Sequence, residues 1–188
     1  MPKNTALLII DMQNDFVQKG RALEVQGIRK GLPKLKTFID ACRAKGIFVV
    51  YTRHCYTPKG NPIQAALFPF MTRKKALLKG TQGWQIALEL QPEHDDRIID
   101  KTRYDAFFRT RLHDILQRRK IGTVIITGTM TEVCCESTAR TAMMLDYKVL
   151  FCADLTFTAK KEIQKRTLEV IEAHFGTVMK AKEIVRSI

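Results

Sequence analysis

The sequence predicts an α/β protein: a three-layer αβα sandwich in which a parallel β-sheet is covered by helices on both faces. Continuous apolar runs bounded by turn residues alternate with helical patterns along most of the chain. Such runs are typical of strands buried on both faces, and their alternation with helices favours right-handed crossovers and a parallel sheet. At 188 residues, the chain is expected to form a single domain over 1–188.

The expected strands are 6–11, 47–53, 97–101, 123–128 and 148–154, with a shorter one near 177–180. The expected helices are roughly 31–44, a short one near 82–90, 106–119, 132–145 and 160–174. In such a sheet the carboxyl ends of all strands lie along one edge, where ligands bind near the reversal of strand order. Polar residues at strand ends are therefore the first candidates for function.

Residues 55–80 interrupt this regular alternation with three prolines and with apolar and basic clusters. A loop of this length inside a compact domain is often a functional lid or an oligomer arm. A surface excursion with one short helix is the alternative, and the sequence leaves both open.

Composition limits the classes of function. The 32 Lys and Arg residues exceed the 19 Asp and Glu residues and give a net charge of +13. The basic clusters at 73–75, 118–120 and 160–161 are far apart and lack interleaved aromatic residues, so we expect a solvated basic surface and no nucleic-acid partner. No apolar run reaches the ~20 residues that span a bilayer, which predicts no membrane partner. The five cysteines and the absence of a secretory pattern favour reduced thiols and a cytoplasmic protein.

Two charged residues end predicted strands. Asp11 follows the apolar run "ALLII", and Lys101 ends "RIIDK". A carboxylate at such a position is unfavourable unless it is paired or solvated. A loop-capping role for Asp11 and a surface role for Lys101 are the alternatives.

The stretch "GTMTEVCCEST" places Cys134 and Cys135 near the start of the helix that follows the fourth strand. With Thr131 as N-cap, free backbone N–H groups and the helix dipole would favour a thiolate at Cys134 and receive an oxyanion. Packing as a small buried residue is the common alternative. A redox pair is disfavoured, because a disulfide between neighbours on a helix is strained. Together, Asp11, Lys101 and Cys134 have the composition of an activated nucleophile.

Three segments, "ALLIIDMQNDF", "KTRYDAFFRTRL" and "TGTMTEVCCESTARTAM", resemble the isochorismatase-like cysteine hydrolases, the group of nicotinamidase, N-carbamoylsarcosine amidase and ureidoacrylate amidohydrolase. The resemblance spans most of the chain. It implies a six-stranded, Rossmann-like doubly wound parallel sheet, an Asp11–Lys101–Cys134 triad, and a cis peptide bond at Thr129–Met130. The cis bond would aim the Met130 N–H, with that of Cys134, at the oxyanion. The implied activity is cleavage of an amide, ureido or carbamoyl C–N bond through a thioester.

The same resemblance limits the cofactors. Nicotinamidases carry an Asp-x-His metal motif after the second strand, where this chain has "TRH", ending at His54. One histidine is a poor metal site, so we expect no metal and no cofactor. We expect His54, Phe16, Trp84 and Tyr104 to line a pocket for a small-molecule substrate. Family members are commonly dimers or tetramers, so a homo-oligomer is expected. Hydrolysis of an ether or ester, or a non-catalytic binding protein with a vestigial triad, remain alternatives.

Overall fold

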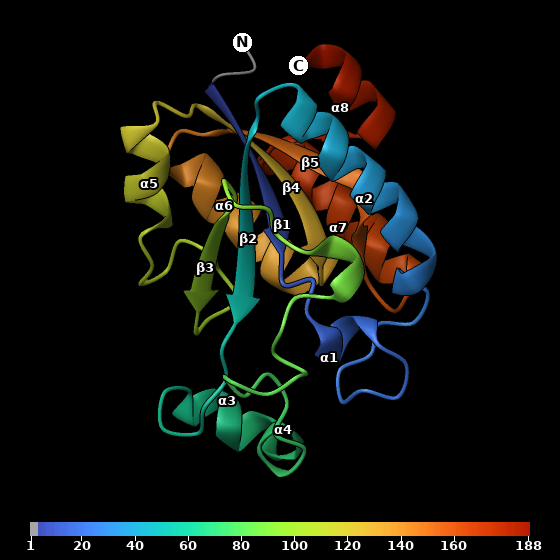
Figure 1. Ribbon diagram of the computed structural model, residues 1–188, viewed down its shortest axis with the longest axis vertical. Coiled ribbons are helices and arrows are strands. Elements are labelled where there is room, and N and C mark those ends of the chain that lie inside the picture. The colour runs from blue at the N-terminus through green and yellow to red at the C-terminus, as the bar shows by residue number, and fades with distance from the viewer. Residues whose placement is uncertain (1–3) are drawn as a thin grey trace.

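The computed structural model describes residues 4–188 and contains one six-stranded parallel sheet with the strand order β3-β2-β1-β4-β5-β6 (Figure 1). The strands are β1 Thr5–Ile10, β2 Phe48–His54, β3 Arg97–Lys101, β4 Thr123–Thr129, β5 Lys148–Phe157 and β6 Thr177–Met179. The reversal of strand order places β1 beside β4. The carboxyl ends of β3, β2, β1 and β4 are therefore neighbours.

The two faces of the sheet bury two separate cores, because successive side chains of a strand point to opposite faces. In β1, Leu7 and Ile9 pack against α2 (Ile28–Ala44) and α8 (Ala181–Ser187), which lie together along one side of the sheet in Figure 1. Ala6, Leu8 and Ile10 pack against α5 (Leu112–Arg118), α6 (Glu136–Met144) and α7 (Lys161–His174). This arrangement confirms the predicted three-layer αβα sandwich.

The segment 55–80 forms a projection beyond the carboxyl end of β2 (Figure 1). It contains two short helices, α3 (Pro62–Leu67) and α4 (Pro69–Arg73). Its return limb is tied to the body at Leu77, whose N–H donates to Asp15 Oδ2 at 2.7 Å and whose C=O accepts from the Tyr56 N–H at 3.0 Å. Its outer face leaves Ile63 and Leu67 exposed.

Two predicted helices are much shorter than expected. Of 82–90, only Leu88–Leu90 forms a single 3₁₀ turn, because the backbone of 83–86 pairs with the short helix α1 (Asn14–Val17) and the residue before it, including a bridge between Gln13 and Ile86. Of 106–119, only Leu112–Arg118 is helical. Side chains take the earlier backbone donors: Asp105 accepts from the Phe107 N–H, and Thr138 from that of Ala106.

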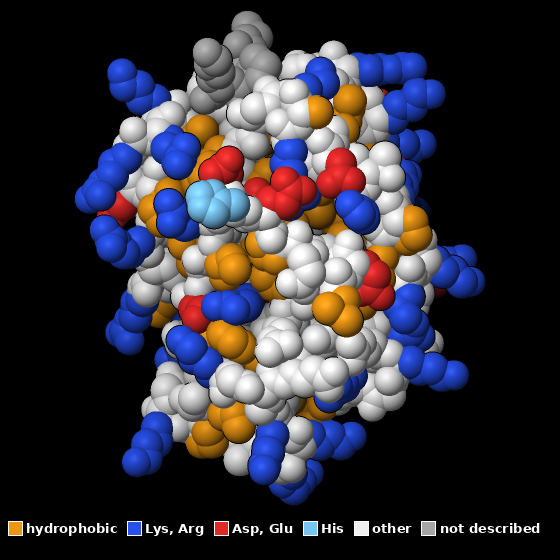
Figure 2. All heavy atoms as spheres, in the orientation of Figure 1, with side chains coloured by type: hydrophobic (Ala, Val, Ile, Leu, Met, Phe, Trp, Pro, Cys, Tyr) orange, Lys and Arg blue, Asp and Glu red, His pale blue; other side chains and the backbone are white. Residues whose placement is uncertain are grey.

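On the face shown in Figure 2, lysine and arginine side chains are spread out rather than gathered in one field, and apolar patches lie between them. All five cysteines are buried and free. Among residues 4–188, no helix combines the length and the apolarity needed to cross a membrane.

Candidate active site

Asp11 and Lys101 form an ion pair that is sealed from solvent. Asp11 directly follows β1 and Lys101 ends β3, and Lys101 Nζ lies 2.6 Å from Asp11 Oδ2 with both side chains 0% exposed. Burial is the largest single influence on Lys101 and disfavours its charge, but the nearby Asp11 carboxylate and Cys134 together outweigh it and raise the pKa of Lys101. The ammonium therefore stays charged.

Thr52, on the strand between these two residues, fixes the Asp11 carboxylate. The Thr52 hydroxyl donates to Asp11 Oδ1 at 2.6 Å and accepts from the Asp11 N–H at 3.1 Å. Asp11 also has a backbone φ of 49°, a left-handed conformation that is uncommon for a residue other than glycine. The second oxygen, Oδ2, has the ammonium beside it but no aligned hydrogen bond, so it retains capacity for a proton.

The ammonium of Lys101 is further held by the backbone. Its Nζ donates to the carbonyl oxygens of Arg103 and Tyr104, each at 3.0 Å. The ion pair with Asp11 supplies the opposite charge beside the ammonium. The loop after β3 thus positions the cation as firmly as the strand does.

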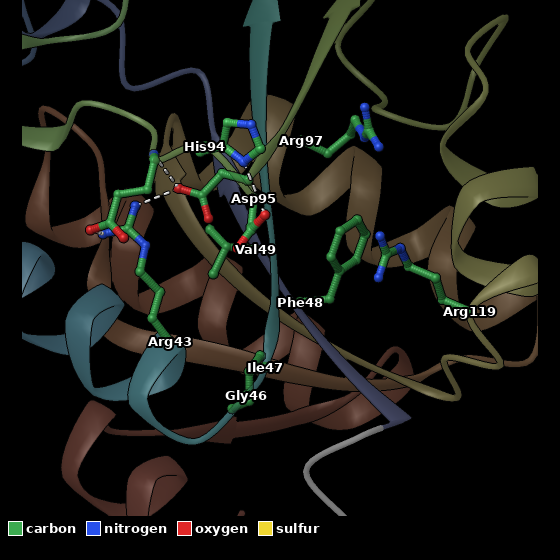
Figure 3. Close-up of a pocket in the computed structure, with 11 residues that line it drawn as sticks. Arg43, Gly46, Ile47, Phe48, Val49, His94, Asp95, Arg97 and Arg119 are labelled. Carbon is green, nitrogen blue, oxygen red and sulfur yellow. Dashed lines mark hydrogen bonds and ion pairs between the residues drawn. The ribbon is translucent and has the colours of Figure 1, made fainter.

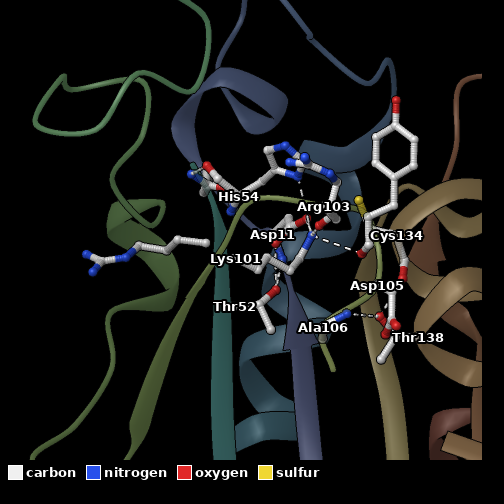
Figure 4. Close-up of polar contacts among 12 residues, drawn as sticks. Asp11, Thr52, His54, Lys101, Arg103, Asp105, Ala106, Cys134 and Thr138 are labelled. Atoms are coloured by element: carbon white, nitrogen blue, oxygen red, sulfur yellow. Dashed lines mark hydrogen bonds and ion pairs between the residues drawn. The ribbon is translucent and has the colours of Figure 1, made fainter. Parts of the chain in front are cut away.

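Cys134 is the third member of this group (Figure 4). Its Sγ, an oxygen of Asp11 and a ring nitrogen of His54 all lie within 4.8 Å of one another. Cys134 lies in a π-helical turn, Thr131–Cys135, that precedes α6. The adjacent Cys135 is 0% exposed and packs in the core with Ala139 and Ala142, which makes it a structural neighbour.

One expectation about this turn is wrong. Thr131 does not cap the helix, because its hydroxyl donates to Gln164 Oε1 of α7 at 2.7 Å. Cys134 rests as a thiol in this turn. Burial raises the pKa of its thiol, Lys101 lowers it only in part, and Asp11 raises it further. The thiol therefore needs a base, and Asp11 is within reach.

The strand that leads to Cys134 passes unusually close to β1. Gly128 has a φ of 109°, and a Cβ at this position would lie 2.1 Å from the Ile10 carbonyl oxygen. Only glycine fits there. The second peptide bond after this glycine, Thr129–Met130, is cis. Thr129 is buried and its hydroxyl donates to the Phe157 carbonyl at 3.1 Å, while Met130 borders the adjacent cavity.

A cavity of about 220 Å³ opens at Cys134. Of the residues expected to bind substrate, Phe16, His54 and Tyr104 line it. The sequence reasoning missed the contribution of the projection, whose Gln64, Phe68, Phe70 and Met71 complete the wall. In the described part of the chain, no charged side chain lines this cavity.

Trp84 lies outside the cavity. Its indole N–H points to Cys55 Sγ at 3.0 Å, and the guanidinium of Arg53 stacks 3.8 Å from its ring centroid. Arg53 also donates to Asp100 at 2.8 Å. Because side chains alternate along β2, Arg53 and its partners face away from the side on which Thr52 and His54 meet Asp11 and Lys101.

The donor set does not fit the metal site that the nicotinamidase motif implies. Thr52 stands at the place of the motif carboxylate and is engaged with Asp11. Asp11, His54 and Cys134 are close enough to share an ion, but the ammonium of Lys101 already lies 2.6 Å from Asp11 and 3.4 Å from His54 Nδ1. A divalent cation there would meet strong repulsion.

A larger hollow, of about 850 Å³, lies at the other end of the sheet. Figure 3 shows its lining at the amino ends of β2 and β3, including the Arg43 side chain and residues 94–97. Arg43 is paired there with Asp96 at 2.5 Å. Among residues 4–188, the lining includes no cysteine, serine or threonine nucleophile, so the smaller cavity at Cys134 is the candidate active site.

A buried carboxylate, ammonium and thiol thus lie close together at the carboxyl edge of a parallel αβα sandwich. The sequence profile of the isochorismatase domain matches residues 5–183, and the chain belongs to this family, the isochorismatase-like cysteine hydrolases.

Individual relatives agree with this family. The chain is 31% identical to nicotinamidase 3 of Arabidopsis thaliana over 99% of this chain and 89% of that protein. It is 34% identical to a probable inactive nicotinamidase of the same plant, over 86% of this chain and 84% of that protein. A crystal structure of a cysteine hydrolase from Pseudomonas syringae pv. phaseolicola superimposes with a TM-score of 0.94 at 28% identity, covering 99% of this chain and 92% of that one.

Proposed function

We propose that the protein is a cysteine-dependent hydrolase that cleaves the C–N bond of a small-molecule amide, with Asp11, Lys101 and Cys134 as its catalytic residues. The observation that carries the proposal is the sealed Lys101–Asp11 pair beside the Cys134 thiol, which itself lines a cavity. The relative named nicotinamidase 3 supports an amide as the substrate class.

The first step transfers the Cys134 proton to Asp11 Oδ2 while the sulfur attacks the carbonyl carbon. A C–S bond forms, and the π electrons of the carbonyl move to its oxygen. We assign the Met130 and Cys134 backbone N–H groups to this oxyanion. Since the resting nucleophile is a thiol, the reaction depends on a base that is held in place, and Thr52 and Lys101 hold Asp11.

The second half returns the protein to its starting state. The tetrahedral intermediate collapses, the C–N bond breaks, and Asp11 gives its proton to the leaving ammonia or amine. Water then loses a proton to Asp11 and attacks the thioester, which releases a carboxylic acid and restores the thiol. Lys101 stays positively charged throughout and compensates each negative charge that develops beside it.

A screen for ammonia or amine release over amides, ureido acids and carbamoyl compounds tests the proposal. We expect Cys134→Ala and Asp11→Asn each to lower kcat/KM by about 10³-fold or more, with circular dichroism unchanged. Cys135→Ala is the matched control, because its sulfur packs in the core, and it should keep activity within a few-fold.

An active Cys134→Ala protein would overturn the thioester route. Release of no amine by the wild-type protein from any compound, with ether or ester cleavage in its place, would favour the isochorismatase-type reaction. Inertness towards all these compounds would favour a non-catalytic binding protein.

A further inference from the structure

His54 joins the ion pair to the cavity. It ends β2 and is 1% exposed. Its Nδ1 lies 3.4 Å from Lys101 Nζ, whereas its Nε2 has no hydrogen-bond partner among residues 4–188. Because His54 lines the cavity and Nε2 is on the far side of the ring from Lys101, this unpartnered nitrogen is turned towards the substrate space.

The contact with Lys101 decides which ring nitrogen carries the proton. An ammonium can only donate hydrogen bonds, so a proton on Nδ1 would face a like charge at 3.4 Å. The lone pair of Nδ1 is therefore the side that faces the ammonium. A neutral imidazole then keeps its proton on Nε2, as a buried donor without an acceptor.

The surroundings also keep the ring neutral. Burial lowers the pKa of His54 to about 4, and Lys101 and Arg103 add to the effect, while Asp11 and Gln64 oppose it. Tyr104 and Cys134 are the other titratable groups near the ring, with the Tyr104 ring centroid 6.0 Å away. The Gln64 Oε1 accepts from Asn61 at 3.2 Å and keeps a second lone pair, and the Gln64 Nε2 approaches Tyr104 Oη at 3.5 Å.

We propose that His54 is a specificity residue, which holds its proton on Nε2 and donates it to a hydrogen-bond acceptor on an uncharged, largely apolar amide. A buried donor left without a partner is unfavourable by about 1–3 kcal/mol, so a substrate with an acceptor at this place is selected over one without. The inference rests on the proposed amide hydrolysis and extends it to the class of substrate.

The cavity walls define the rest of this class. Phe16, Phe70, Met71 and Val133 supply apolar surface, and the described lining contains no arginine or lysine for a carboxylate and no acid for an amine. A charged substrate would lose its hydration without gaining a partner. An aromatic or branched primary amide with one neutral acceptor fits these walls.

The position of His54 does not depend on its side chain, which allows substitution. Gln13 clamps the His54 backbone from both sides: its Oε1 accepts from the His54 N–H at 2.8 Å, and its Nε2 donates to the His54 carbonyl at 3.1 Å. His54→Phe keeps a ring without a donor, and His54→Gln keeps an N–H at the end of the side chain. His113→Gln, at a half-buried histidine that does not line this cavity, is the matched control.

The tautomer is tested by ¹⁵N NMR of the wild-type protein, with the His54 signal assigned by its loss in His54→Gln. We expect a proton on Nε2 and no titration of this ring from about pH 5.5 to about pH 8. A ring that titrates near pH 6.5, or that carries its proton on Nδ1, would overturn the proposal.

The donor role is tested with benzamide and the three pyridinecarboxamides, which differ from benzamide only by a ring nitrogen that accepts a hydrogen bond. We expect at least one isomer to exceed benzamide by about tenfold in kcat/KM. This advantage should disappear in His54→Phe, persist in His54→Gln, and be unchanged in His113→Gln. An equal loss of kcat/KM for all four amides in His54→Phe would overturn the donor role of His54. The same kcat/KM for all four amides in the wild-type protein would also overturn it.

Amide binding to an inactive variant tests the role of His54 separately from the proposed hydrolase activity. In Cys134→Ala, which cannot turn over an amide by the proposed route, the favoured pyridinecarboxamide should shift the His54 Nε2 resonance and bind about tenfold more tightly than benzamide. This result without any turnover by the wild-type protein would retain the role of His54 and refute the hydrolase. Turnover without the shift would refute the role of His54 alone.

Discussion

Thr52 sets the direction of the Asp11 carboxylate by a pair of reciprocal hydrogen bonds. Its hydroxyl occupies Oδ1, which leaves Oδ2 for Lys101 and for the proton of Cys134. A carboxylate without this restraint would turn about its own bond and present either oxygen to the thiol. The reaction we propose therefore depends on a residue that never contacts the substrate.

Thr52→Val tests this dependence, because it replaces the hydroxyl with a methyl group of similar size. The Asp11 N–H and Oδ1 each lose a buried partner, so we expect the free energy of unfolding to fall by about 1–3 kcal/mol. We expect kcat to fall by about 10-fold to 100-fold with a smaller change in KM, as measured by steady-state kinetics. Thr52→Ser, which keeps the hydroxyl, is the control, and equal effects of Ser and Val would contradict a role for the hydrogen bonds.

Sequence reasoning found Asp11, Lys101 and Cys134 because charged or nucleophilic residues at the ends of apolar runs stand out. It did not find Thr52, since a threonine inside a strand is ordinary. The alternation of β2 was an available signal: Thr52 and His54 are two residues apart and share a face. The raised pKa of Cys134 could not be predicted, because it depends on a burial that only packing reveals.

At the scale of elements, one buried carboxylate ties the projection to the body of the protein. Asp15 is 5% exposed and accepts the Leu77 N–H at 2.7 Å. Leu77 closes the projection, whose residues form much of the cavity wall. The shape of the cavity is thus set by a contact at the base of the projection.

Asp15→Ala removes this contact and should loosen the projection. We expect hydrogen exchange at the Leu77 amide to accelerate by about 10-fold to 100-fold and KM to rise several-fold, with kcat little changed. Asp15→Asn keeps one acceptor oxygen, so its exchange rate at Leu77 and its KM should lie between those of the wild-type protein and Asp15→Ala. Unchanged exchange at Leu77 in Asp15→Ala would show that the projection is held by other contacts.

The strands were more predictable than the helices for a physical reason. Strands buried on both faces must be apolar throughout, so β1 to β5 were located within a few residues of their bounds. At 82–90 the backbone pairs with 13–15 and does not form the predicted helix. At 106–119 side chains accept the first backbone N–H groups, so the helix begins later than predicted. Neither the backbone pairing nor the side-chain acceptors can be predicted from local sequence. The role of 55–80 as lid or interface stays a prediction.

At the scale of the whole molecule, the buried neutral histidine links stability to pH. The pKa of His54 is lowered from its ordinary 6.5 to about 4, so between these values the unfolded chain binds a proton that the folded protein does not. The contribution of the neutral His54 ring to the free energy of unfolding is therefore full above pH 6.5 and is lost as the pH falls towards 4.

Denaturant unfolding at a series of pH values measures this loss. We expect His54 to account for a decline of at most about 3 kcal/mol between pH 6.5 and pH 4. His54→Gln should flatten this part of the profile. Identical profiles for wild type and His54→Gln would mean that His54 is not buried as a neutral ring.

The order of the strands has a consequence for refolding. The functional groups form a row across the neighbouring strands β3, β2, β1 and β4, but the chain supplies them from position 11 to position 134. The last to arrive, Cys134, is separated from Asp11 until β4 inserts beside β1, with Gly128 against Ile10. Any intermediate that contains only β1, β2 and β3 carries an ion pair without a nucleophile. The return of activity after denaturation therefore reports when the centre of the sheet has closed.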